Sequence, residues 1–395
     1  MRAQKGDLMT KHIAVLGATG SVGTQALDVA RRRGYRVELM SAHRNHMAME
    51  ALAREFCPHT VVMTDESAAC ELRARLADTP CRVLGGEEAL LGAIAEATVD
   101  TVVHAILGAA GLRPTLATLE AGHRLALANK ESLVLAGDIV MARAHERGVE
   151  ILPVDSEHCA IFQSLKAGAP REVRRLLLTA SGGPFFGYTR EQLAAVSAAD
   201  TLRHPTWRMG EKITVDSATL MNKGFEIMEA VHLFDVPEER VEVVVHRESI
   251  LHSAVEYTDN TVIGEMSVPD MRMCVQYAVD YPDRHPSDTP PLDLCALGRM
   301  TFFPPDTEAF PLLSLARRAS RLGGGMGAVL CAADECAVEA FLAGKLTFLG
   351  ISECVEATFD ACLDARAAST VEERIAADAL ARARAREYIQ HRTKR

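Results

Sequence analysis

Residues 11–33 read KHIAVLGATGSVGTQALDVARRR, a short apolar strand, a glycine-rich turn and a helical pattern in direct succession. Glycine permits a sharp turn and lets a pyrophosphate approach the backbone, while the start of the next helix offers free N–H groups and a positive dipole end. The glycine spacing is G-x-x-G-x-x-G rather than the usual G-x-G-x-x-G. The stretch indicates a nucleotide phosphate site, with a plain tight turn between strand and helix as the alternative.

A second turn follows the next expected strand, residues 37–41. It reads His43-Arg44-Asn45, at the position where an NAD-binding fold usually carries an acid that contacts the ribose hydroxyls. A cation at Arg44 favours the 2′-phosphate of NADP instead. The alternative is that Arg44 is an ordinary exposed loop charge.

Strand and helix patterns continue to alternate up to residue 154. Apolar strands are expected at 60–64, 82–84, 101–105, 124–128 and 150–154. Such alternation predicts a doubly wound parallel sheet, in which ligands gather at the carboxyl ends of the strands. Asn129-Lys130-Glu131 lies at one of these ends, although a polar triplet there is also typical of a loop.

The composition excludes several classes of protein. With 395 residues and a net charge of −10, the chain has no excess of cations for a nucleic-acid surface. The ten cysteines include no C-x-x-C pair, so we expect reduced thiols and a cytoplasmic protein. We expect neither a signal peptide nor a membrane span, because no run of eighteen apolar residues occurs.

An acidic pair follows the strand at 150–154, in the sequence Asp155-Ser156-Glu157-His158. On an extended chain Asp155 and Glu157 would face the same way, and two adjacent carboxylates are costly unless a cation joins them. Mg²⁺ or Mn²⁺ is the natural partner, with Glu226 as a third oxygen ligand. The alternative is a charge pair at a helix start, and for His158 a structural role is expected.

Residues 204–229 read HPTWRMGEKITVDSATLMNKGFEIME and contain the only Trp of the chain. Trp207 stands in a Pro- and Gly-containing entry before an expected strand, as a mobile lid or as a core anchor. Asp216 and Ser217 are expected at the N-cap of the following helix, which suits a phosphate. Helical spacing places Asn222, Glu226 and Glu229 on one face with Lys223 beside them, although a solvated amphipathic helix would look similar.

A further turn, Ser181-Gly182-Gly183, follows an apolar strand at 175–180 and is either a small anion cradle or a plain turn. Residues 186–203 look helical. Together with the strand at 175–180, strands at 241–245, 253–257 and 261–268 are expected to form a second sheet.

The rest of the chain has a different character. Residues 281–311 are rich in Pro and Asp and indicate a linker, and the helical patterns at 326–342, 352–367 and 371–390 indicate a small bundle. The domains predicted from the sequence are 1–154, 155–285, 286–317 and 318–395.

The motifs GATGSVG, LANKESLV, PVDSEH, SGGPF, HPTWRMGEKITVDSATLMNKGFEIMEA and HSAVEYTDNTVIGEMSVPDMR occur in this order. This set closely resembles the 1-deoxy-D-xylulose 5-phosphate reductoisomerase family over nearly the whole chain. The resemblance implies a Rossmann-like NADPH domain, a central α+β catalytic domain and a C-terminal helical bundle. It also implies NADPH- and metal-dependent conversion of that sugar phosphate to 2-C-methyl-D-erythritol 4-phosphate, in isoprenoid precursor synthesis, by a homodimer.

The resemblance carries roles to individual residues. The divalent ion would be held by Asp155, Glu157 and Glu226. The catalytic set would be Lys130, Glu157, Glu226 and, in a mobile loop, Trp207. The substrate would contact Lys130, Ser156, Glu157, Ser181, His204, Ser217, Asn222, Lys223 and Glu226. NADPH would contact Thr19, Gly20, Ser21, Val22, Arg44, Asn45, Asn129, Glu131 and Gly210. A departure from the family is His43, where many members carry Gly.

Two rival functions have to be weighed. A simpler NADP-dependent sugar-phosphate dehydrogenase would share the fold, and a non-enzymatic NADP-sensing regulator would keep the glycines and Arg44. Neither needs three converging carboxylates. The DSE and NKGFE motifs therefore favour the reductoisomerase.

Overall fold

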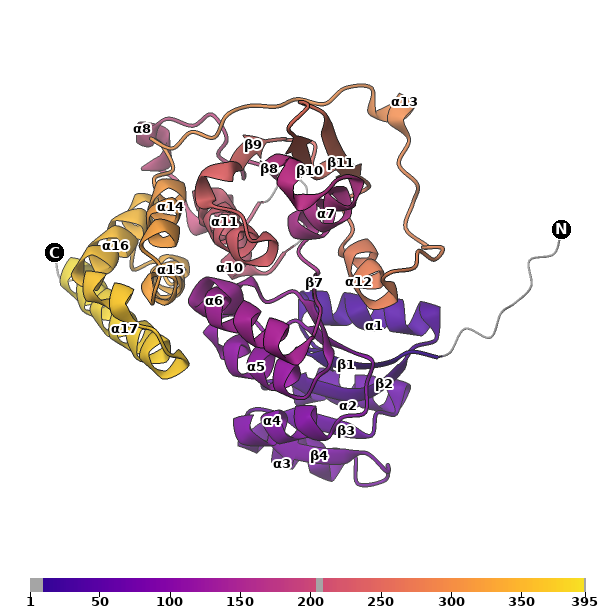
Figure 1. Cartoon of the computed structure of the whole chain (residues 1–395). Helices are drawn as coiled ribbons and strands as arrows, with labels where there is room; N and C mark the ends of the chain where they lie inside the picture. Colours follow the sequence, from indigo (N-terminus) through magenta and orange to yellow (C-terminus); the bar gives the residue numbers. More distant parts are fainter. Residues whose placement is uncertain (1–9, 204–208, 394–395) are drawn as a thin grey trace. The chain divides into compact units, whose positions relative to one another are not determined.

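The computed structural model describes residues 10–203 and 209–393 (Figure 1). The predictions for His204 and Trp207 lie outside these ranges. The chain forms two compact units. The first contains residues 10–129, 143–154 and 271–287, and the second contains residues 130–142, 155–270 and 288–393.

A seven-stranded sheet forms the centre of the first unit. Its spatial order is β4-β3-β2-β1-β5-β6-β7, and all neighbouring strands are parallel. The strands are β1 (His12–Leu16), β2 (Arg36–Ala42), β3 (Thr60–Met63), β4 (Arg82–Gly85), β5 (Thr101–His104), β6 (Arg124–Leu127) and β7 (Ile151–Pro153). Because the strand order reverses between β1 and β5, the sheet has the switch point of a doubly wound fold. The predicted fold class is confirmed.

Helices connect these strands and pack on the sheet, as Figure 1 shows. They are α1 (Ser21–Arg33), α2 (His46–Phe56), α3 (Glu66–Arg75), α4 (Glu87–Glu96), the 3₁₀ turn η1 (Ala109–Gly111), α5 (Leu112–Glu120) and, from later in the chain, α12 (Met271–Asp280) against α1. Helix α1 ends as its sequence predicts, with three arginines in the last turn and Gly34 in the left-handed conformation. Apolar residues of the strands, such as Leu16, Leu39 and Val102, form the buried core.

The turn after β1 can be made only with glycine. Gly17 has φ of +80°, and a Cβ there would lie 2.5 Å from the carbonyl oxygen of Ala105 after β5. A Cβ at Gly23, on α1, would lie 2.1 Å from the carbonyl oxygen of Gly17. The glycines therefore let α1 begin directly against the ends of β1 and β5.

A four-stranded mixed sheet lies in the second unit. Its order is β11-β10-β8-β9, with β8 and β9 parallel and the other pairs antiparallel. The strands are β8 (Val173–Ala180), β9 (Val241–Val245), β10 (Leu251–Tyr257) and β11 (Val262–Met266). Helices α7 (Ser156–Ser164) and α11 (Met221–Phe234) contact its strands. The same unit also contains the first part of α6 (Lys130–Arg147), α8 (Arg190–Leu193), α9 (Ala198–Thr201), α10 (Glu211–Thr219) and α13 (Leu294–Leu297). The second sheet predicted from the sequence is thus present.

Residues 186–203 contain two short helices instead of the continuous helix expected. Thr189 accepts a hydrogen bond from Gln192 N, and Ser197 accepts one from Asp200 N. Each side chain starts a new helix, because a capping residue satisfies the N–H groups of the following turn. The segment is therefore divided at Ser197.

The C-terminal helices pack on one another at the yellow end of the chain (Figure 1). They are α14 (Leu312–Leu322), α15 (Met326–Leu342), α16 (Phe348–Ala361) and α17 (Val371–Thr393). Helix α15 is buried along most of its length, between α16 and α17 on one side and α10 on another. The predicted helical region is confirmed, while the division into four domains stays a prediction. Within the described residues, the structure contains no helix with the length and apolarity needed to cross a membrane.

Candidate active site

The carboxylates of Asp155 and Glu157 meet at the start of helix α7. Asp155 is the N-cap residue, and its Oδ1 accepts a hydrogen bond of 3.3 Å from Glu157 N. Asp155 therefore caps a helix whose first turn contains Glu157, and the continuous extended chain expected through both acids is wrong. The physical reason is capping, because an acid is favoured where the first N–H groups of a helix lack partners.

Glu226 completes a group of three acids. One carboxylate oxygen of Asp155, one of Glu157 and one of Glu226 all lie within 4.8 Å of one another. Glu226 is 1% exposed, on helix α11. Three hard oxygen ligands at this spacing fit Mg²⁺ or Mn²⁺, which bind through a few carboxylates and keep positions for water or substrate. The donor set therefore fits the ion that the sequence predicts.

Two lysines lie among these acids. Lys130, the first residue of α6, has its Nζ 2.5 Å from Asp155 Oδ2 and 3.1 Å from Glu226 Oε1. The Nζ of Lys223 is 2.9 Å from Glu157 Oε1 and also pairs with Glu226. Since Lys223 is 4% exposed, the alternative of a solvated amphipathic helix is wrong. Buried charges of both signs are instead concentrated at one place.

The lysines are hydrogen-bond donors at ordinary pH. Burial would lower the pKa of Lys130, but the charges of Asp155 and Glu226 outweigh burial and raise it well above the usual value. Burial would also lower the pKa of Lys223, but the charges of Glu157 and Glu226 outweigh burial and raise it. Lys130 also donates to Asn222 Oδ1 at 3.0 Å.

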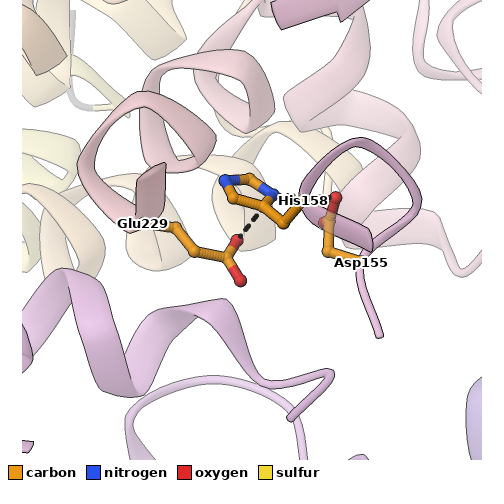
Figure 2. Close-up of side chains that lie close together, drawn as sticks. All are labelled: Asp155, His158 and Glu229. Carbon is orange, nitrogen blue, oxygen red and sulfur yellow. Dashed lines mark hydrogen bonds and ion pairs between the residues drawn. The ribbon is translucent and has the colours of Figure 1, made fainter. Parts of the chain in front are cut away.

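A buried histidine joins the acids of α7 and α11 (Figure 2). His158 Nε2 lies 2.8 Å from the backbone oxygen of Glu226, so this nitrogen carries a hydrogen. Its Nδ1 lies 3.1 Å from Asp155 Oδ1 and 3.4 Å from Glu229 Oε2, the ion pair dashed in Figure 2. Burial would lower the pKa of His158, but Glu229 and Asp155 raise it to about 9. Burial itself raises the pKa of Glu229 to about 8.

These contacts decide between two possible metal groups. Asp155, His158 and Glu229 also bring ligand atoms within 4.8 Å of one another. His158 bonds through Nε2 to the backbone oxygen of Glu226 and through Nδ1 to Asp155 Oδ1, so it orients Asp155, and the group of three acids is the better fit for a hard cation. The structural role expected for His158 agrees with this geometry. The sequence placed Glu229 on the same helix face as Asn222 and Glu226 but assigned it no ligand or catalytic role.

The Ser181–Gly183 turn packs against the end of helix α10. Gly182 and Gly183 have φ of +74° and +66°. A Cβ at Gly183 would lie 2.8 Å from the backbone oxygen of Ser217, so the turn and the helix end are in close contact. Arg247, which sequence reasoning missed, donates from Nη1 to the backbone oxygens of Ser181 and Gly183, both at 2.6 Å. The turn that contains Ser181 therefore lies against the helix end that contains Ser217, the second serine predicted to bind substrate.

The expected strand and N-cap within residues 211–219 are both wrong. Residues Glu211–Thr219 form helix α10, and Asp216 and Ser217 lie inside it. Helix α11 begins at Met221, after Leu220 in the left-handed conformation. Lys212 and Asp216 pair one turn apart at 2.7 Å, which supports the helix despite its β-branched residues.

The predicted cofactor residues of the first unit follow strands β1, β2 and β6. Thr19, Gly20, Ser21 and Val22 form the start of α1, with Gly20 as N-cap. The Arg44 side chain is 74% exposed and pairs with Asp65 at 2.9 Å, an ion pair that costs little to exchange for a phosphate. Asn45 caps α2 by accepting from Ala48 N. Asn129 is buried and donates to the backbone oxygens of Ile106 and Gly108, which shapes the loop after β5.

Two further predicted cofactor residues belong to the second unit. Glu131 lies in the first turn of α6, and Gly210 is the N-cap of α10. Near Arg44, the Nδ1 of His43 lies 2.9 Å from Thr64 Oγ1. The ligand roles assigned to all these residues stay predictions.

Comparison with known proteins gives a consistent family. Residues 13–137 match the family model described as 1-deoxy-D-xylulose 5-phosphate reductoisomerase, and residues 151–234 and 266–384 match two models described as C-terminal domains of that enzyme. The reductoisomerase of Symbiobacterium thermophilum is 50% identical over 358 residues, which are 89% of this chain and 92% of the relative. That of Citrifermentans bemidjiense is 45% identical over 382 residues, 96% of this chain and 99% of the relative.

Solved structures agree with the sequence relatives. A DOX-P reductoisomerase in complex with NADPH, fosmidomycin and magnesium is 39% identical, with a TM-score of 0.91 over 96% of this chain and 98% of that one. The reductoisomerase of Zymomonas mobilis in complex with NADPH is also 39% identical, with a TM-score of 0.89 over the same shares of the two chains.

Proposed function

The chain belongs to the 1-deoxy-D-xylulose 5-phosphate reductoisomerase family, and from that premise we propose that it converts this sugar phosphate to 2-C-methyl-D-erythritol 4-phosphate, using NADPH and Mg²⁺ or Mn²⁺. The observation that carries the proposal is the meeting of Asp155, Glu157 and Glu226 within 4.8 Å, with two lysines beside them. The product feeds isoprenoid precursor synthesis by the non-mevalonate route.

The overall reaction has a rearrangement and a reduction. The rearrangement breaks one carbon–carbon bond and forms another, most simply by aldol cleavage and re-addition, without a change in composition. The bound divalent ion supplies Lewis-acid polarisation of the substrate's carbonyl and hydroxyl oxygens. NADPH supplies the hydride that, together with one proton, reduces the rearranged aldehyde to the alcohol of the product.

Lys130 and Glu157 handle protons in this proposal. Lys130 is positively charged and already directs its ammonium toward Asn222 and the acids, so it is placed to donate to a substrate oxygen. Glu157 lies at the more exposed side of the three acids and accepts hydrogen bonds from Ser156 and Lys223. Its carboxylate is the group best placed to accept a proton from a substrate hydroxyl.

The substrate phosphate is bound by Ser181, Ser217, Asn222 and Lys223 in this proposal, together with His204. The contact between the Ser181–Gly183 turn and the end of α10 supports a shared role for the two serines. Phosphate binding lies away from the breaking bond, and its free energy orients the substrate. Arg44 binds the 2′-phosphate of NADPH, and the start of α1 binds its pyrophosphate.

Assembly as a homodimer is also part of the proposal. Strand β11 lies at one edge of the four-stranded sheet, and its Val262 is 51% exposed. An exposed edge with an apolar residue supports pairing with a second copy. Light scattering of wild type and of Val262→Lys, which adds a charge to that edge, tests this. A cytoplasmic location follows from the ten cysteines and their spacing.

The function is tested with purified protein, 1-deoxy-D-xylulose 5-phosphate and NADPH. Oxidation of NADPH that needs Mg²⁺ or Mn²⁺, stops with chelator and yields the branched tetritol phosphate is the expected result. NADPH oxidation that gives an unbranched alcohol would favour the simpler dehydrogenase. NADPH binding without turnover with either ion would favour the regulator.

A further inference from the structure

Helix α10 contacts a different neighbour on each of its two sides. Ser217 and Ala218 lie against the Ser181–Gly183 turn, where a Cβ at Gly183 would be 2.8 Å from Ser217 O and 3.0 Å from Ala218 Cα. The position of α10 along its axis therefore sets the place of Ser217 beside the turn. The atoms of α10 that face Gly183 are backbone atoms, which cannot rotate away as a side chain can.

The other side of α10 carries charges toward helix α15. Lys212 and Asp216, one turn apart, face Asp334. The Nζ of Lys212 lies 2.7 Å from Asp216 Oδ2 and 2.8 Å from Asp334 Oδ2. The same ammonium lies 5.0 Å from the centre of the Phe225 ring. The three charged groups thus connect two helices through one cation.

The two carboxyl groups of this cluster are buried, while the Lys212 side chain is 30% exposed. Asp334 has no exposed surface, and within the described ranges Asp216 Oδ1 and both carboxyl oxygens of Asp334 accept no hydrogen bond, so Lys212 and Asp334 form an ion pair only. Two other groups, Cys331 and Glu131, also act electrostatically on Lys212, and neither is a cation. Burial and the charge of Asp334 raise the pKa of the Asp216 carboxyl well above its usual value.

An ionic cluster of this kind costs more to bury than apolar side chains of the same size. What it adds is register, because an ammonium satisfies two carboxyl groups only when both helices are in one relative position. Apolar packing would tolerate small shifts of α10 along α15. At the far side of the helix, the space between Gly183 and Ser217 has no room for even a Cβ, so a shift of α10 toward the turn would bring backbone atoms together.

We propose that Lys212, Asp216 and Asp334 are positioning residues that hold α10 at one register on α15 and so place Ser217 beside Ser181 for the substrate phosphate. This inference rests on the proposed function and adds residues of the C-terminal helical region to its phosphate site. None of the three touches the substrate. Their effect on the reaction passes through the end of α10.

The test compares Asp334→Asn with a matched variant on the same helix. Glu335→Gln removes the neighbouring charge, which pairs with Arg382 at 2.6 Å on α17 and not with α10. We expect Asp334→Asn to raise KM for 1-deoxy-D-xylulose 5-phosphate roughly 10-fold, through a displaced phosphate contact, and to raise KM for NADPH as well, because the predicted cofactor residue Gly210 is the N-cap of the same helix. Glu335→Gln is expected to leave both KM values within about 2-fold of wild type.

A double-mutant cycle separates positioning from general loss of stability. In a Ser217→Ala background, where the positioned hydroxyl is absent, Asp334→Asn should change KM for the sugar phosphate by less than about 2-fold. Full multiplication of the two single effects, or equal KM values for Asp334→Asn and Glu335→Gln, would overturn the inference. If Asp334→Asn does not fold, Lys212→Arg keeps the charge while changing its geometry, and the same cycle with Ser217→Ala applies.

The wild-type assay distinguishes failure of the proposed function from failure of the positioning role. A wild type without metal-dependent NADPH oxidation would contradict the proposed function. An active wild type with an Asp334→Asn variant that behaves like Glu335→Gln would contradict only the positioning role.

Discussion

Replacing Gly183 by alanine tests whether the contact between the turn and α10 positions the site. The new Cβ would lie 2.8 Å from Ser217 O, whereas ordinary contacts begin at 3.4 Å, so the oxygen has to move by about 0.6 Å. Gly183 also has φ of +66°, which costs alanine about 1–2 kcal/mol. Overpacking against backbone adds about 1–3 kcal/mol. We expect Gly183→Ala to lose about 2–5 kcal/mol in total.

Gly187 in the same loop is the matched control. It has φ of +81°, yet a Cβ there would meet nothing within 4 Å. Gly187→Ala should therefore lose only the conformational part, about 1–2 kcal/mol. Denaturant unfolding measures both values. Steady-state kinetics should give roughly a 10-fold higher KM for the sugar phosphate in Gly183→Ala alone. Equal stabilities and equal KM values for the two variants would refute the reasoning.

Two further predictions concern the first unit. Arg44→Ala should raise KM for NADPH by about 10-fold or more and leave KM for NADH nearly unchanged, because only NADPH carries the phosphate that the guanidinium would bind. Arg36→Ala, which removes another exposed arginine, is the control. Equal effects on both cofactors, or the same loss in the control, would contradict the assignment. Burial lowers the pKa of His104 to about 4 from 6.5, so its contribution to stability is present above pH 6.5 and is lost as the pH falls toward 4. The loss amounts to about 3 kcal/mol, and His104→Asn should remove it from the pH dependence of unfolding; parallel curves for wild type and variant would contradict this.

The first sheet could be predicted because its signals are local. Apolar strands alternate with helical patterns, and glycines mark the turn after β1, where a Cβ at Gly17 or Gly23 would overlap backbone atoms. Short-range patterning of this kind needs no knowledge of distant residues. The strand boundaries expected from the sequence lie within two residues of those observed.

Helix α10 could not be predicted, because distant residues determine its environment. Its residues Ile213, Thr214 and Val215 favour a strand by propensity. The ion pair of Lys212 with Asp216 and the buried Asp334, more than a hundred residues later, favour the helix. Tertiary contacts outweigh propensity here.

The acidic site was predicted in its residues but not in its geometry. Asp155 and Glu157 meet across a helix start, since Asp155 caps α7. The sequence also gave no sign that α11 is buried on nearly all sides, and this burial is what places His158 and Glu229 beside Asp155. Sequence spacing was enough to assign residues to a site, but which side chain contacts which could be known only from the folded structure. The metal-binding role of the three acids stays a prediction.

Binding of Mn²⁺, followed by electron paramagnetic resonance, tests the central claim that Asp155, Glu157 and Glu226 hold the metal. We predict one tight Mn²⁺ per wild-type chain, loss of that binding in Glu226→Gln with NADPH affinity unchanged, and retention of it in Glu229→Gln. The last variant removes an acid that contacts His158 rather than the three converging oxygens. Undiminished Mn²⁺ binding by Glu226→Gln, or its loss only in Glu229→Gln, would contradict the account.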